Sequence, residues 1–210
     1  MGKDYRKPWH GHFYKMRILA IGGHPDDIFL YCAGTLLRLL DEGNEVRTMV
    51  CTNGESRGGL RIAEERKANK LSGIKESYFL EFPDGSLSHG LELISAIDKV
   101  VLVYDPDIVL SHNELDTHQD HVAVYKAVRS ANRNWDFNWL TYESYDIRNG
   151  FMPNLFVDIS KYYDKKLELL NVYESQQGRW YFNDGVISAR SLGAKAGERV
   201  ERFRIEYFSI

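Results

Sequence analysis

The sequence predicts an α/β fold, a Rossmann-like three-layer arrangement with a mostly parallel sheet and helices on both faces. Short apolar runs of strand length alternate along the chain with longer segments whose apolar residues recur at helical spacing. Such alternation favours right-handed crossovers, which make successive strands parallel and pack helices on both faces of the sheet. The chain has 210 residues and shows no linker or repeat, so we expect a lead-in over residues 1–15 and a single domain over 16–210.

The first elements are predicted from a change in apolar spacing. RILAIG at 17–22 is an apolar run too short for a buried helix, so we expect a buried strand there. In GTLLRLLDEGN at 34–44 the leucines recur at helical spacing, and Gly43 is expected to end the helix. EVRTMVCT at 45–52 is the next expected strand.

The later elements continue the alternation. A helix is expected at 60–73, and a strand at 77–83 ends at the turn sequence PDGS. Pro106 is expected to end the helix that begins at residue 91, because the residue before a proline disfavours helical geometry. The remaining expectations are strands at 107–112, 137–144 and 154–160, helices at 118–133 and 162–175, and one helix and one late strand within 178–210.

Composition excludes several classes of protein. The formal net charge of −3 provides no basic surface for nucleic acid. No apolar run reaches the length of about 20 residues that a membrane helix needs, and residues 1–16 lack the apolar core of a signal peptide. Cys32 and Cys51 alone cannot form a disulfide framework. We therefore expect a cytoplasmic protein that binds neither nucleic acid nor membrane, with homo-oligomerisation left open.

Two loops carry the densest clusters of His and Asp. GGHPDD follows the first expected strand and SHNELDTHQDH follows the fourth. Ligands of parallel α/β sheets bind beyond the carboxyl ends of the strands, so we expect both clusters at one edge of the sheet. His24, Asp27 and His121 there offer two imidazoles and one carboxylate with open positions left over. That set is typical of a catalytic divalent cation site, most commonly zinc, although iron and cobalt also accept it.

The neighbours of these ligands suggest further roles. Adjacent side chains cannot share one direction, so Asp26 is expected to point elsewhere than Asp27 and to be free as a base. His118 and His121 are three residues apart and can face one side of a helical turn. Taken singly, an Asp pair before a helix can be only an N-cap, and a His at a helix start can be a plain surface residue. His112 lies near the cluster or simply ends its strand.

The segments GGHPDD, AGTLLRLL, TNGE and DTHQDH together resemble the PIG-L/LmbE-type metal-dependent de-N-acetylases, from about residue 17 to about residue 175. That family removes acetyl groups from N-acetylated amino sugars and their conjugates. The resemblance implies zinc as the cofactor, bound by His24, Asp27 and His121. The family often has a Glu just after the two Asp residues, where this chain has Ile28 and Phe29.

The resemblance also implies catalytic roles. Asp26 is expected to be the general base, and His118 to stabilise the oxyanion or to protonate the leaving amine. Asp120 is expected to orient His118 by accepting its other ring N–H. These roles suit amide hydrolysis, which needs a polarised carbonyl, an activated water and a proton for the leaving amine.

Candidate substrate contacts come from the loop after the second strand. Arg57 and Arg61 in TNGESRGGLR are suited to sugar phosphate or carboxylate recognition. The alternative is that they pair with Glu64 and Glu65 on the same helix. Aromatic and polar residues that could contact a sugar ring, or simply pack, are Tyr142, Glu143, Trp180 and Tyr181.

The function expected from these observations is a zinc-dependent hydrolase that deacetylates an N-acetylamino sugar of the N-acetylglucosamine type, free, glycosidic or nucleotide-linked. One alternative is an amidase acting on a larger sugar conjugate with the same metal chemistry. The other is a non-catalytic metal- or nucleotide-binding α/β domain. The first turn, GGHPDD, is not a glycine fingerprint for a pyrophosphate.

Overall fold

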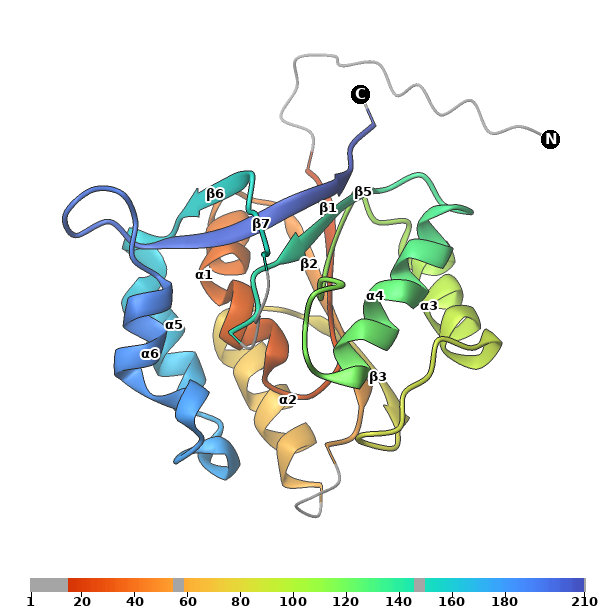
Figure 1. The fold of residues 1–210 in the computed structure, drawn as a ribbon, viewed down its shortest axis with the longest axis horizontal. Helices are drawn as coiled ribbons and strands as arrows, with labels where there is room; N and C mark the ends of the chain where they lie inside the picture. Colours follow the sequence, from red (N-terminus) through yellow and green to blue (C-terminus); the bar gives the residue numbers. More distant parts are fainter. Residues whose placement is uncertain (1–14, 55–58, 146–149, 210) are drawn as a thin grey trace.

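A mostly parallel sheet forms the centre of the protein. The computed structural model describes residues 15–54, 59–145 and 150–209. The strands in these residues are β1 (Arg17–Gly22), β2 (Glu45–Thr52), β3 (Glu76–Phe82), β4 (Ile108–Ser111), β5 (Asn138–Tyr142), β6 (Leu155–Asp158) and β7 (Val200–Tyr207). Their order in the sheet is β3-β2-β1-β4-β5-β7-β6 (Figure 1). Strands β1 to β5 pair in parallel, and β7 pairs antiparallel with β5 and β6. The predicted α/β fold class is confirmed.

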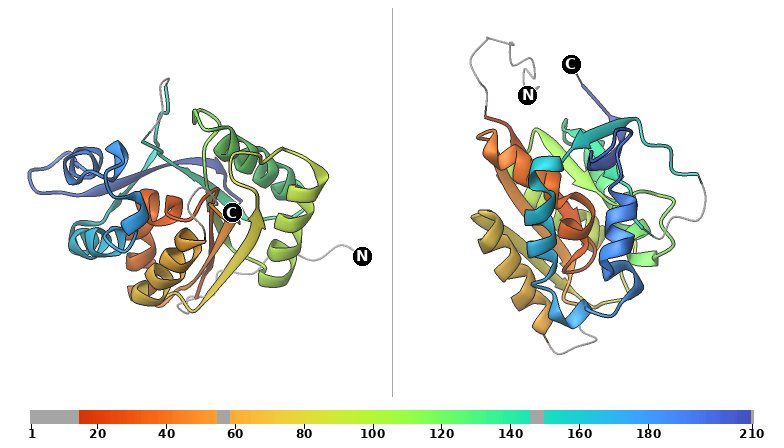
Figure 2. Two further views of the ribbon diagram at one scale, coloured as in Figure 1. Left: turned by 90° about the horizontal axis from the view of Figure 1, so that it is seen from below. Right: turned by 90° about the vertical axis from the view of Figure 1, so that its left-hand side faces the viewer.

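Helices cover both faces of the sheet. They are α1 (Asp27–Asp41), α2 (Leu60–Ser72), α3 (Leu91–Tyr104), α4 (Gln119–Asn132), α5 (Tyr163–Leu170) and α6 (Asp184–Arg190), with the short 3₁₀ helices η2 (Ser160–Tyr162), η3 (Glu174–Gln176) and η4 (Trp180–Phe182). Helices α3 and α4 lie on one face, and α1, α2, α5 and α6 lie on the other (Figures 1 and 2). No helix among the described residues combines the length and the apolar character that a membrane span requires.

Strand β1 is buried along almost its whole length. Ile18 and Ala20 pack into the core on the α1 side, whereas Leu19 and Ile21 pack into the core on the α3 and α4 side. All four side chains are fully buried, which is why the run is apolar at every position and not only at alternate ones. Burying one such aliphatic side chain contributes about 1.5–3 kcal/mol to folding. The strand that leads into GGHPDD is thus rigidly held.

Helix α1 begins earlier than the sequence predicts. The apolar spacing predicted a helix from about residue 34, but the structure begins it at Asp27. The first turns were missed because they are buried all round, so no amphipathic period marks them. The helix is interrupted at Cys32, whose φ of −139° is not helical. The helix expected at 162–175 is shorter than predicted, since α5 ends at Leu170 and η3 follows.

A buried ion pair stabilises the interruption in α1. The Glu201 carboxylate on β7 accepts the backbone N–H groups of Gly34 (3.0 Å) and Thr35 (2.7 Å), just after Cys32. It has the role that an N-cap side chain has at the beginning of a helix. Lys166 of α5 donates to Glu201 Oε1 at 2.7 Å, and the two residues are 1% and 4% exposed. Burial lowers the pKa of Lys166, but Glu201 outweighs that effect and raises it.

We expect Lys166→Met to lower the free energy of unfolding by about 3–5 kcal/mol, because it leaves the buried Glu201 carboxylate without its cation. Urea denaturation followed by circular dichroism measures the change. The matched control is Lys165→Met on the same helix, where the ammonium group pairs with Glu168 at a half-exposed site, and a change below about 1 kcal/mol is expected. Equal, small effects of the two substitutions would contradict this role for the ion pair.

Candidate metal centre

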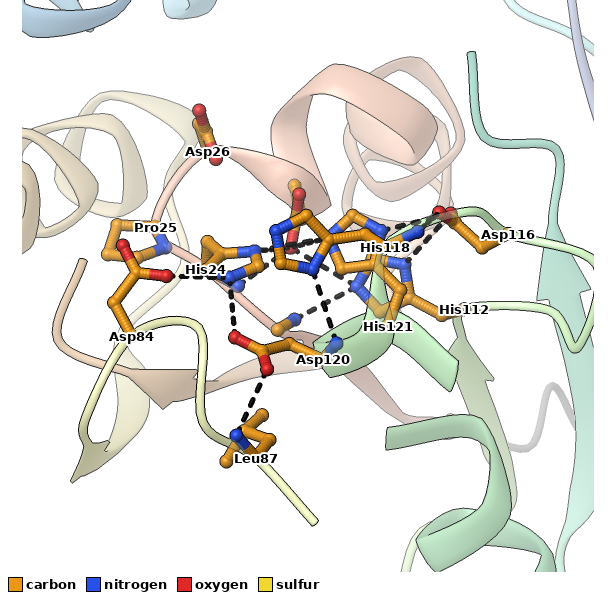
Figure 3. Close-up of polar contacts among 12 residues, drawn as sticks. His24, Pro25, Asp26, Asp84, Leu87, His112, Asp116, His118, Asp120 and His121 are labelled. Carbon is orange, nitrogen blue, oxygen red and sulfur yellow. Dashed lines mark hydrogen bonds and ion pairs between the residues drawn. The ribbon is translucent and has the colours of Figure 1, made fainter. Parts of the chain in front are cut away.

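The two His and Asp clusters meet at the carboxyl ends of β1 and β4. These strands are neighbours in the sheet, with Ala20 of β1 opposite Leu110 of β4. The chain leaves β1 toward α1 and leaves β4 toward α4 (Figure 1). Strand order reverses between β1 and β4, which is where α/β sheets leave a crevice for ligands. Figure 3 shows that the histidines of both loops converge there.

Three side-chain atoms form a nearly equilateral triangle, which we call the ligand triangle. Its corners are Nδ1 of His24, Oδ2 of Asp27 and Nε2 of His121. The two nitrogens are 3.1 Å apart, His24 Nδ1 and Asp27 Oδ2 are 3.3 Å apart, and His121 Nε2 and Asp27 Oδ2 are 3.2 Å apart. The predicted set His24, Asp27 and His121 is therefore brought together.

The size of the ligand triangle fits a small divalent cation. Two ligands at about 2.0–2.1 Å from a tetrahedral zinc ion lie about 3.3 Å from each other. Each edge of the triangle is close to that length, and two nitrogens and one carboxylate oxygen are ligand types that zinc accepts. Three protein ligands leave a fourth tetrahedral position, as in catalytic sites. The residues present thus fit the cofactor that the sequence predicts.

The ring of His121 is oriented by a carboxylate on its far side. Its Nδ1 lies 2.9 Å from Asp116 Oδ2, so Nδ1–H donates there and the Nε2 lone pair is directed into the triangle. Burial lowers the pKa of His121, but Asp27 and Asp116 outweigh burial and raise it to about 9. Metal ligands with a carboxylate behind the imidazole follow this pattern.

The ring of His24 is oriented in the same way. Its Nε2 lies 3.1 Å from Asp120 Oδ2 and 3.1 Å from Asp84 Oδ1, so Nε2–H faces two carboxylates and Nδ1 faces the triangle. Asp120 also accepts the backbone N–H groups of Gly85 (2.7 Å) and Leu87 (3.0 Å), which fixes the carboxylate. Figure 3 shows the contact with Leu87.

Asp120 therefore has a different partner from the one predicted. The sequence placed its carboxylate on His118, but the structure places it on His24. The contact between Asp120 and His118 runs the other way, because the backbone N–H of Asp120 donates to His118 Nδ1 at 3.2 Å. The reason is the start of α4, where His118 is the N-cap residue and accepts the N–H two residues on.

His118 stands beside the triangle and not in it. Its ring centroid is 4.6 Å from that of His24 and 4.7 Å from that of His121. Burial, together with the neighbouring His121, lowers the pKa of His118, which favours the neutral ring. Because Nδ1 accepts an N–H, the proton of the neutral ring is on Nε2.

Overlapping sets of His and Asp also converge among the described residues. Besides His24, His118 and His121, these are Asp27, His112 and His121, and also His24, Asp84 and Asp120. His112 is fully buried, with Nε2 2.9 Å from the Gly23 nitrogen and 3.1 Å from Asp27 Oδ2. The sequence left its role open, and the structure stacks its ring on His121 at 3.7 Å. The ligand triangle is the best-supported cation site of these, because the outer ring nitrogen of each of its two imidazoles lies against a carboxylate.

Asp26 occupies a strained position next to the triangle. Its φ is +112°, which a non-glycine residue rarely adopts. Burial raises the pKa of Asp26, Arg61 opposes that effect, and Asp27 adds to it. Figure 3 shows Asp26 apart from the cluster of imidazole rings, in agreement with the prediction that it points elsewhere than Asp27.

Arg61 contacts Asp26 directly. Its Nη2 lies 2.9 Å from Asp26 Oδ1 and 2.8 Å from the Pro25 carbonyl oxygen. Glu64 does not pair with it, because that carboxylate accepts from Ser175. Gly54 is required here, since a Cβ at that residue would lie 2.9 Å from Arg61 Cδ. Arg57, the other predicted substrate contact, lies outside the described residues.

One cavity of about 270 Å³ joins these groups. Its lining includes Asp26, Arg61, the ligand triangle, and Trp180 and Tyr181 of η4. Tyr142 and Glu143 do not line it: Tyr142 is fully buried and donates to the Ile21 carbonyl, and Glu143 faces Arg202. A larger, open groove of about 780 Å³ between α2 and β3 contains none of the His and Asp residues described above.

Comparison with known proteins agrees with this arrangement. The model of the PIG-L family, GlcNAc-PI de-N-acetylase, matches residues 19–132, which contain both clusters. The uncharacterized deacetylase YaiS of Escherichia coli (strain K12) is 36% identical over 168 residues, or 75% of this chain and 90% of that protein. The chain belongs to the PIG-L family of de-N-acetylases.

Two further proteins extend the PIG-L likeness. The diacetylchitobiose deacetylase of Thermococcus kodakarensis is 28% identical over 186 residues, covering 76% of this chain and 70% of that protein. The solved structure of N,N'-diacetylchitobiose deacetylase from Pyrococcus horikoshii matches with a TM-score of 0.78 at 25% identity, covering 90% of this chain and 83% of that one.

We expect Asp116→Asn to weaken zinc binding by this PIG-L chain roughly 10–100-fold, because the amide offers one acceptor where His121 Nδ1 and the His118 N–H need two. Competition with a chromogenic zinc chelator measures the affinity. The control is Asp164→Asn, at an exposed position of α5, which should leave the affinity unchanged. Unchanged affinity in both variants would remove Asp116 from the support of the site.

Proposed function

We propose that this chain is a zinc-dependent deacetylase that hydrolyses the acetamido group of an N-acetylglucosamine-type sugar. The observation that carries the proposal is one cavity in which the ligand triangle and a separate carboxylate, Asp26, face the same space. An open cation site beside a carboxylate that is not one of its ligands is what amide hydrolysis requires. Family membership and the names of the diacetylchitobiose deacetylases support an acetamido sugar as the substrate.

His24, Asp27 and His121 would hold the cation. When bound, it supplies Lewis acidity, which polarises the amide carbonyl and makes water more acidic. The chain's own residues then have to place the substrate, accept one proton and donate another.

Asp26 is assigned the role of general base. Its carboxylate lines the cavity, and burial raises its pKa, which makes it a better proton acceptor than an exposed aspartate. The hydrogen bond from Arg61 holds the carboxylate in one orientation. After it takes a proton from the attacking water, the same group can deliver that proton to the leaving amine.

His118 is assigned the stabilisation of the oxyanion. As a neutral ring with its proton on Nε2, it is a donor beside the triangle, and it lines the same cavity. Donating to an oxygen that gains negative charge stabilises the tetrahedral state more than the ground state. The alternative, in which His118 protonates the leaving amine, uses the same ring nitrogen.

The cavity indicates how much of the substrate is enclosed. Its volume of about 270 Å³ is near the lower end of the ~300–1,000 Å³ that is typical of small-molecule sites, which suits a ligand about as large as one sugar. Trp180 is 55% exposed at this cavity and offers an aromatic face to a sugar ring. A nucleotide or second sugar would extend beyond the cavity.

We expect the zinc-loaded protein to release acetate from at least one acetamido sugar in a panel of N-acetylglucosamine, N,N'-diacetylchitobiose and nucleotide-linked N-acetylglucosamine. Asp26→Asn should lower kcat by about 10²–10⁴-fold, because it removes the base, and should leave zinc affinity unchanged. Enzymatic acetate detection and the chelator competition assay measure the two quantities.

The outcomes separate the alternatives. Release of a bulkier acid from a larger conjugate, with no acetate from the panel, would favour the amidase. Zinc binding without any hydrolysis would favour a non-catalytic domain. A normal rate in Asp26→Asn would contradict its assignment as base.

A further inference from the structure

A buried carboxylate that the mechanism does not use lies directly behind Asp26. Glu65 of α2 is 0% exposed. Its Oε2 accepts the backbone N–H of Asp26 at 3.0 Å and the hydroxyl of Tyr173 at 2.5 Å, and its Oε1 lies 3.4 Å from Asn69 Nδ2. Among the described residues, no Lys, Arg or His forms an ion pair with it.

Such a carboxylate is expensive to bury. Burial raises the pKa of Glu65 to about 7, against the lowering effect of the Tyr173 hydroxyl and the Asp26 N–H. A surface-facing residue on α2 would avoid this cost, and a purely structural acceptor need not be an acid. The arrangement therefore points to something that Glu65 does for Asp26.

The backbone of Asp26 needs such support. A non-glycine residue at a φ of +112° is strained and persists only where its surroundings over-determine it. Three groups hold it: Glu65 on its N–H, Arg61 on its Oδ1, and the N–H of Leu30 on its carbonyl oxygen at 2.9 Å. Of these, only Glu65 accepts a hydrogen bond from the backbone N–H of Asp26. The direction of that N–H changes when φ changes.

Resting on the deacetylase function proposed above, we propose that Glu65 and Tyr173 are positioning residues for the general base. Glu65 holds the Asp26 peptide in its strained conformation, which aims the Asp26 carboxylate into the cavity. Tyr173 holds Glu65 by donating its hydroxyl hydrogen. Neither touches the substrate or the cation.

The GGHPDDIF motif ends in two apolar residues, Ile28 and Phe29. The family often has an acid just after the two Asp residues, but here Phe29 packs near the Tyr173 ring, with centroids 6.3 Å apart. A further buried carboxylate beside the motif comes from another helix, α2, through Glu65. The polar contact to the motif is thus supplied from α2, while Ile28 and Phe29 belong to the apolar core.

Two substitutions at Glu65 test the proposal. Glu65→Gln keeps a carbonyl oxygen that can accept from both Asp26 N–H and the Tyr173 hydroxyl, but it removes the charge. Glu65→Leu removes the acceptor with little change in volume. On the acetamido sugar that the zinc-loaded wild type hydrolyses best, we expect Glu65→Leu to lower kcat about 100-fold, with KM and zinc affinity within about threefold.

Glu65→Gln should stay within about fivefold of the wild-type kcat, because the positioning contact is kept. Tyr173→Phe, which removes only the second hydrogen bond, should lower kcat by about 3–10-fold, and it decides the matter if Glu65→Leu fails to fold. A wild-type kcat in Glu65→Leu or Tyr173→Phe would overturn the proposal. So would an equal loss in the Gln and Leu variants, since the charge and not the position would then matter.

A second readout does not depend on catalysis. In zinc-loaded protein, the amide hydrogen of Asp26, followed by ¹H–¹⁵N NMR, should exchange at least about tenfold faster in Glu65→Leu than in wild type or Glu65→Gln. Equal exchange in all three would overturn the positioning role. If the wild type hydrolyses no acetamido sugar while exchange still follows Glu65, the proposed function fails and the positioning of Asp26 holds.

Discussion

The close approach of His24 Nδ1 and His121 Nε2 is the constraint on which the rest of the site depends. The two atoms are 3.1 Å apart although 97 residues separate them in the sequence. Only the direct pairing of β1 with β4 brings their loops together. The full burial of β1 and the starts of α1 and α4 at the same edge then fix the directions in which the loops leave the sheet. A shift of one residue in the β1–β4 register would separate the triangle.

The charges of the surrounding carboxylates explain why the two imidazoles are stable so close together. Buried carboxylates surround the imidazoles: Asp27 in the triangle, and Asp116 and Asp120 behind the rings. Burying such groups is costly unless cations or donors face them. The neighbouring acids raise the pKa of His121 to about 9 against the effect of burial, so they favour protons or a cation at its imidazole. A divalent cation that displaces these protons meets ligands already in place.

The two adjacent aspartates of GGHPDDIF contact different groups. Asp27 is directed into the triangle by the first turn of α1, whereas the positive φ of Asp26 turns its carboxylate toward Arg61. The two carboxylates thus face different groups, a guanidinium for Asp26 and imidazoles for Asp27. The acids behind Asp26 and behind the histidines come from α2, from the β3–α3 loop, from the β4–α4 loop and from the first turn of α4. These segments belong to three crossovers of the sheet.

The sequence was sufficient to predict the fold class and the meeting of His24, Asp27 and His121, because the alternation of strands and helices places both motifs at one edge of the sheet. That these residues bind zinc stays a prediction. The sequence was insufficient to predict the acids that hydrogen-bond to the two imidazoles and to the backbone of Asp26. Asp84 and Glu65 lie in no motif, and Asp116 lies in DTHQDH without a sign of its role. The roles of all three depend on side-chain directions that only packing decides. The prediction for Asp120 was wrong about its partner for the same reason, since the N-cap geometry of His118 turns the two residues apart. Helix α1 was predicted to start late because a helix buried on all sides has no amphipathic period.

The most direct test of the ligand triangle is an anomalous diffraction measurement at the zinc edge on crystals of the zinc-loaded protein. The account predicts one peak about 2.0–2.2 Å from His24 Nδ1, Asp27 Oδ2 and His121 Nε2 together. A zinc ion bound instead by His24, Asp84 and Asp120, or one that takes His118 as a ligand in place of Asp27, would contradict it.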